Sequence, residues 1–153
     1  MDNNDVLRRL RYIFDLGDSK VIEVFGLGGE EFTRAQISDW LKKEEDESFK
    51  KCNDKTLAVF LNGFITLHRG QKQGVEQKPE TELTNNLILW KLRIALNLRS
   101  DDVMKVMQQA DFPISEHEIS ALFRKPGHKH YRECKDQFLR NFLLGLQKKH
   151  RNN

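Results

Sequence analysis

Residues 134–145 read Cys-Lys-Asp-Gln-Phe-Leu-Arg-Asn-Phe-Leu-Leu-Gly, and the architecture follows from this segment because the chain contains its pattern twice. Residues 52–63 carry the same pattern: a cysteine, an aspartate two residues later, and then Leu, Phe-Leu and Gly at matching spacings. The two cysteines are 82 positions apart (134 − 52 = 82), and a His-Arg pair follows each copy at the same distance. A pattern that recurs at a fixed offset is the sequence signature of a repeat architecture.

The repeat extends well beyond this segment. Aligning residues 3–70 with residues 85–152 at the same offset gives 19 identities in 68 positions. Average residue usage would give only about 4 by chance. The sequence therefore contains a tandem duplication.

Each repeat is expected to begin with two amphipathic helices. The first should start at one of the paired asparagines at 3–4 and 85–86, because asparagine caps helices well. Apolar residues then recur at helical spacing. The second, shorter helix should follow the Asp/Ser pairs at 18–19 and 100–101, which can also act as caps.

A capping box marks the third helix of each repeat. Ser115 is followed three residues later by Glu118, and apolar residues flank the pair as a hydrophobic staple. Residues 32–37 repeat the arrangement with different side chains. These helices are expected to end near Lys43 and Lys125, before polar loops that differ between the repeats.

The opening motif forms the fourth helix. Asp54 and Asp136 lie at its N-terminus, where a carboxylate caps the helix or meets the positive end of its dipole. Arg11 and Arg93, in the first helix of each repeat, either reach these aspartates or remain solvated.

These signals predict an all-α protein built by tandem duplication of a four-helix repeat. The repeats are expected to span 1–70 and 85–153, with a polar linker over 71–84 that contains glycine and proline. One repeat of this size has a marginal core on its own. We therefore expect a pseudo-twofold arrangement in which the apolar faces share a core.

Composition indicates a water-soluble chain with an uneven charge distribution. Hydrophobic residues make up 38% and charged residues 32%, with a formal net charge of +3. The net charge is −2 over residues 1–70, −1 over 71–84 and +6 over 85–153. The apolar runs are too short to cross a membrane, and the N-terminus lacks the features of a secretory signal. A cytosolic location is expected.

Cys52 and Cys134 are open to a reactive or a structural interpretation. A cysteine at a helix N-terminus can have a lowered pKa. However, no His/Asn/Asp pattern surrounds either residue, and cysteine is among the most buried residue types. Buried structural thiols are the preferred interpretation.

Neither a metal nor a cofactor is expected. His117, His128, His130 and Cys134 are close in sequence, but their spacing fits no familiar zinc pattern and the first repeat lacks the histidines. The glycine-rich residues 25–29 follow a helix and lack the dinucleotide-binding spacing, so they are interpreted as a loop.

Gly63 and Gly145 are unusual because glycine inside a helix costs about 1 kcal/mol relative to alanine. A shared glycine at this position predicts a neighbouring helix too close for a Cβ atom. The first helix of the repeat, or the fourth helix of the other repeat, is the expected neighbour.

The second and third helices resemble a helix-turn-helix, in which the third helix would present Glu116, His117, Ser120, Arg124 and Lys125 to DNA. The intervening segment is longer than the usual turn. A cluster of basic residues could still bind a nucleic-acid backbone without reading sequence. This cluster comprises Arg124, Lys125, Lys129, Arg132 and Lys135.

The duplicated pattern of a capped third helix, the Cys-x-Asp-x-x-Leu-x-x-Phe-Leu-x-Gly segment and His-Arg resembles the bacterial YehS family. The resemblance implies a two-repeat bacterial protein, and it transfers no active site, because the family has no assigned function. From the residues we expect a non-enzymatic helical interaction or regulatory protein with an unidentified protein partner. A nucleic-acid-binding protein acting through the second repeat is the alternative, and a cysteine-dependent enzyme is the least favoured.

Overall fold

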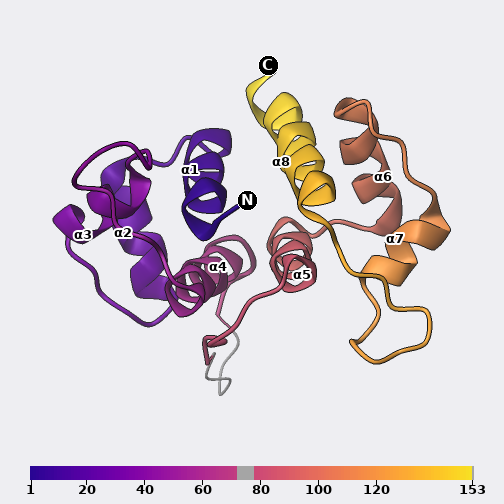
Figure 1. The fold of residues 1–153 in the computed structure, drawn as a ribbon, viewed down its shortest axis with the longest axis horizontal. Helices are drawn as coiled ribbons and strands as arrows, with labels where there is room; N and C mark the ends of the chain where they lie inside the picture. The colour runs from indigo at the N-terminus through magenta and orange to yellow at the C-terminus, as the bar shows by residue number, and fades with distance from the viewer. Residues whose placement is uncertain (72–77, 153) are drawn as a thin grey trace. The chain divides into compact units, whose positions relative to one another are not determined.

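The computed structural model describes residues 1–71 and 78–152, and over these residues the regular structure consists of eight helices. The chain divides into two compact units, Met1–Leu83 and Thr84–Asn153 (Figure 1). The all-α class and the tandem four-helix duplication are confirmed. Residues 72–77 of the predicted linker lie outside the described residues, and the predicted core shared by the repeats stays a prediction.

The helices of the two units correspond closely to the offset found in the sequence. The first unit contains α1 (Asn3–Ile13), α2 (Asp18–Leu27), α3 (Arg34–Leu41) and α4 (Asp54–Arg69). The second contains α5 (Asn85–Leu96), α6 (Ser100–Gln109), α7 (Glu116–Leu122) and α8 (Asp136–Arg151). The last helices, α4 and α8, match residue for residue at the 82-residue offset.

The capping boxes predicted for the third helices are confirmed. The Thr33 side chain accepts a hydrogen bond from the main-chain N–H of Gln36 in α3. The Ser115 side chain accepts one from the main-chain N–H of Glu118 in α7. Both third-position side chains bond back to the cap. Both helices end earlier than predicted, at Leu41 and Leu122, before the polar segments begin.

The asparagines predicted to cap the first helices have another role. Asp2 caps α1 by accepting from the Asp5 amide, and Thr84 caps α5 by accepting from the Leu87 amide. The caps of α2 and α6 are likewise one residue earlier than predicted. Because other residues provide the caps, the asparagine pairs at 3–4 and 85–86 are available for long-range hydrogen bonds.

The predicted close approach at Gly63 and Gly145 is confirmed, but the predicted neighbour is wrong. A Cβ atom added at Gly63 would lie closer than 3.0 Å to the main-chain oxygen of Val24 in α2. One added at Gly145 would be equally close to the main-chain oxygen of Val106 in α6. The crossing partner is therefore the second helix of the same unit, because α2 packs most extensively on α4 and α6 on α8.

The crossing in the first unit is constrained from both sides. A Cβ atom at Gly28, the residue after α2, would lie closer than 3.0 Å to the main-chain oxygen of Val59 in α4. The matching residue of the second unit is Ala110, so that unit tolerates a Cβ there. The loop predicted over residues 25–29 is therefore wrong for residues 25–27, which form the last turn of α2, and Gly28 is explained by helix packing.

Gly63→Ala and Gly145→Ala should each destabilise the protein by about 1–3 kcal/mol, because overpacking outweighs the gain in helix propensity. Urea unfolding of each variant provides the measurement. Gly26→Ala is the matched control, because Gly26 is also helical and nothing lies within 4 Å of its added Cβ atom. Glycine variants that unfold at or above the parent's urea midpoint would refute the packing explanation.

Candidate functional site

A buried side-chain amide connects three segments of the first unit. The Asn4 side chain, which is 0% exposed, donates from Nδ2 to the main-chain oxygens of Trp40 (2.9 Å) and Lys50 (2.8 Å). Its Oδ1 accepts from the main-chain nitrogen of Cys52 at 2.9 Å. The amide thus fixes α1 against the end of α3 and the irregular segment that leads to α4.

The second unit repeats this arrangement. Asn86 donates from Nδ2 to the main-chain oxygens of Leu122 (3.0 Å) and Arg132 (2.8 Å). Its Oδ1 accepts from the main-chain nitrogen of Cys134 at 2.8 Å. All partner atoms belong to the main chain, so the arrangement does not depend on the side chains at residues 122 and 132.

The neighbouring asparagine completes the connection at the start of the last helix. Asn3 donates to the main-chain oxygen of Cys52 (3.1 Å) and to Oδ1 of Asp54 (2.7 Å). Asn85 donates to Cys134 and Asp136 at the same two distances, 3.1 and 2.7 Å. The hydrogen bond from Asn85 is the main reason that the pKa of Asp136 is lowered.

We call this hydrogen-bonded arrangement the asparagine clasp. It consists of Asn3, Asn4, Cys52 and Asp54 in the first unit, and of Asn85, Asn86, Cys134 and Asp136 in the second. Sequence reasoning missed the clasp, although the identity of all four residues across the duplication was a signal for it.

The two arginines considered as partners of these aspartates make other contacts. Arg11 forms an ion pair with Asp18 at 3.5 Å. Arg93 donates to the main-chain oxygen of Leu98 at 2.9 Å, and its guanidinium carbon lies 4.4 Å from the centre of the Phe123 ring. The hypothesis that Arg11 and Arg93 reach the motif aspartates is therefore wrong.

Both cysteines are buried, and neither has the environment of a nucleophile. Burial, with a smaller contribution from nearby carboxylates, raises the pKa of Cys52 and of Cys134 to about 12. Cys52 precedes the cap of α4, Asn53, and so lies outside the first turn where the helix dipole would lower its pKa. The geometry favours the structural interpretation of these thiols.

The histidines near Cys134 do not gather around it. His117, His128 and His130 are exposed, whereas Cys134 is buried. Across the residues that the structure describes, no three His, Cys, Asp or Glu side chains are grouped so as to hold a metal ion.

The predicted basic cluster is divided by its ion pairs. Arg132 pairs with Glu118 at 3.3 Å, and Lys135, the cap residue of α8, pairs with Glu133 at 3.2 Å. The remaining cations, Arg124, Lys125 and Lys129, are exposed and form no ion pair within residues 1–71 and 78–152.

The helix-turn-helix interpretation loses two of its contact residues. Because α7 ends at Leu122, Arg124 and Lys125 lie in the following segment and not on the helix that would enter a groove. Glu118 is occupied at the cap and with Arg132. A basic loop remains as the candidate nucleic-acid contact.

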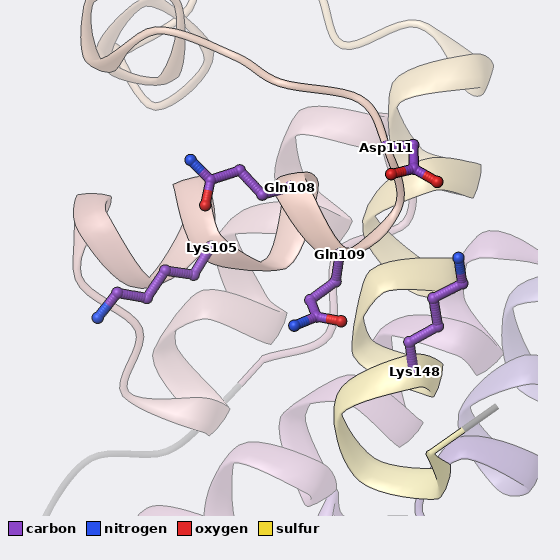
Figure 2. A pocket seen from close by; sticks show the side chains of 5 residues that line it. All are labelled: Lys105, Gln108, Gln109, Asp111 and Lys148. Atoms are coloured by element: carbon purple, nitrogen blue, oxygen red, sulfur yellow. The ribbon is translucent and has the colours of Figure 1, made fainter.

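Sequence reasoning also missed an open polar hollow of about 450 Å³ in the second unit (Figure 2). Its side chains come from α6, α8 and the segment after α6. They are Lys105, Gln108, Gln109, Asp111 and Lys148. The ammonium groups of the two lysines point in different directions, so they do not converge on one ligand (Figure 2).

In the part of the chain that the structure describes, no helix has the length and apolarity needed to cross a bilayer.

The repeat boundaries coincide with those of a known family. The model of DUF1456, a protein family of unknown function, matches residues 3–70 and again residues 85–152. The chain belongs to this family. It is 44% identical over 147 residues to the uncharacterized protein YehS of Escherichia coli (strain K12), covering 95% of this chain and 94% of that protein. No solved structure matches the chain. The resemblance to YehS seen in the sequence is thus confirmed.

Asn4→Ala and Asn86→Ala should each destabilise the protein by about 2–4 kcal/mol, because each leaves buried main-chain groups without hydrogen bonds. Chemical denaturation measures the loss. Asn141→Ala is the control, since the hydrogen bond that the Asn141 side chain donates, to the main-chain oxygen of Gln137, lies within α8. The role assigned to the clasp would be wrong if all three variants were equally stable.

The native thiols should react very slowly with an aromatic disulfide reagent at pH 8, because a pKa of about 12 leaves almost no thiolate and burial blocks access. Both thiols should react rapidly in denaturant. Comparing the two time courses measures the protection, and rapid reaction of either thiol in the folded protein would contradict the structural interpretation.

Proposed function

We propose that the protein is a non-enzymatic helical interaction or regulatory protein. The observation that carries the proposal is that the polar motif residues common to both repeats are engaged in hydrogen bonds inside each unit. The asparagines, cysteines and aspartates of the motif are occupied by the asparagine clasp, and the thiols are buried. These residues serve architecture, which leaves the exposed surfaces to provide specificity.

Those surfaces differ between the repeats. The segment after α3 contains the acidic run 44–47, whereas the matching residues 126–129 read Pro-Gly-His-Lys. Two units that share a four-helix architecture but differ in their exposed side chains suit a protein that contacts partners through its surface. We include a cytosolic location in the proposal, because both cysteines are free thiols and reducing compartments keep thiols in this state.

Nucleic-acid binding through the second repeat is the alternative. The exposed cations Arg124, Lys125 and Lys129 favour it, because unpaired cations on one loop can bind phosphates without reading bases. The pairing of Arg132 and Lys135 with glutamates weakens it, since each ion pair would have to exchange for a phosphate contact.

A cysteine-dependent enzyme has the least support. A nucleophilic thiolate needs a low pKa and access to substrate, whereas burial gives Cys52 and Cys134 a pKa of about 12.

Affinity capture with the full chain tests the proposal, and random duplex DNA tests the alternative. We expect capture of a protein partner from a nuclease-treated bacterial lysate, and only weak DNA binding at 150 mM salt. If nucleic acid were the ligand, affinity would fall steeply between about 50 and 200 mM salt. It would also fall in the variant R124E/K125E/K129E, and nuclease treatment would abolish capture.

A further inference from the structure

We infer that the outward face of α5 is a docking surface for an acidic, amphipathic segment of a protein partner. We call it the α5 face; its residues are Leu87, Trp90 and Ile94 of α5 and Phe123, which follows α7. The inference rests on the proposed function and names the surface that would perform it.

The α5 face combines large apolar side chains with solvent exposure. Trp90 is 43% exposed and Ile94 37%, and their spacing of four residues places them on one side of the helix. The Trp90 ring centre lies 5.9 Å from that of Phe123. The aromatic contact makes the patch continuous from α5 to the basic segment that begins at Arg124.

The first repeat is polar at two of the four equivalent positions, and Tyr12 and Leu41 match Ile94 and Phe123. Asp5 and Arg8 correspond to Leu87 and Trp90. Arg8 forms an ion pair with Asp5 and donates to the main-chain oxygen of Lys42 at 2.7 Å. In the second repeat this polar pair is replaced by the half-buried Leu87 and the exposed Trp90, so the duplicated frame itself does not require these hydrophobic side chains.

The charged residues of α5 and of residues 119–132 are all basic, and Glu118 and Glu133 lie just outside these bounds. Neither α5 nor residues 119–132 contains an aspartate or glutamate. Arg124, Lys125 and Lys129 continue from Phe123 as exposed cations. An apolar patch with a positive rim is complementary to a segment that carries apolar anchors and carboxylates.

The composition favours a protein over a nucleic acid. Base stacking requires open aromatic faces, but the Arg93 guanidinium already covers one face of Phe123 at 4.4 Å. Leu87 and Ile94 offer no stacking surface. Tryptophan and arginine around aliphatic contacts are typical of energetically important residues in protein interfaces, and an amphipathic helix presents anchors at matching spacing.

Site-specific photo-crosslinking tests the location. Benzoylphenylalanine is placed at Ile94 in the full chain, and at the matching exposed residue of the first repeat, Tyr12, as control. We expect Ile94, and not Tyr12, to crosslink in a nuclease-treated lysate to a segment of another protein that mass spectrometry maps as acidic and apolar. Crosslinks to nucleic acid, to a second copy or to residues 1–71 of the same chain, or none, would overturn the inference.

A peptide of the mapped segment tests the chemistry. The fluorescence anisotropy of the dye-labelled peptide reports binding without depending on Trp90, so it applies to every variant. Trp90→Arg, which introduces the residue of the first repeat, and R124E/K125E should each weaken binding about tenfold or more. K105E/K149E makes the same charge change elsewhere in the second unit and should weaken it much less.

Thermal unfolding of each variant shows whether it is folded. If Trp90→Arg does not fold, R124E/K125E still tests the inference. Equal affinities for R124E/K125E and K105E/K149E would overturn the inference. If the full chain captures a partner that crosslinks away from Ile94, the proposed function stands and this surface is wrong. If nothing is captured, both fail.

Discussion

Each unit depends on one buried carboxamide. The segments that precede α4 and α8 have no regular secondary structure, so their main-chain groups need partners from elsewhere in the fold. From inside the first helix of the unit, Asn4 and Asn86 each supply two such bonds. Each makes a third bond to the end of the third helix. Asparagine can do this because its amide both donates and accepts, which an aspartate or a leucine of similar size cannot.

The clasp explains which residues the duplication kept and which it changed. Its asparagines are identical in both repeats, whereas the residues whose main-chain oxygens Asn4 and Asn86 bind differ, as Trp40 and Leu122 do. The glycines follow the same logic, because Gly63 and Gly145 each face a main-chain oxygen of the second helix. At these positions the residue type is the same in both repeats, because a side chain bonds to the main chain or a glycine lets the main chain of another helix approach.

The surface side chains can vary because the clasp bonds to main-chain atoms. Once the loop before the last helix is held by its main chain, its side chains can be acidic in one repeat and basic in the other without loss of the fold. The same holds on the first helix, where the Asp5–Arg8 ion pair has given way to Leu87 and Trp90. Duplication has therefore preserved a frame and produced two chemically distinct surfaces.

The helical content, the repeat and the capping boxes could be read from the sequence, because periodicity and capping are local properties of the chain. The need for a small residue at Gly63 and Gly145 could also be read, but its partner helix could not, since crossing partners depend on how four helices pack. The clasp was missed for a similar reason: Asn4 and Cys52 are 48 residues apart, and an asparagine near a helix start is locally the same as a cap. The pKa of the thiols was also decided by tertiary structure, because burial at the end of that clasp outweighs their position next to a helix.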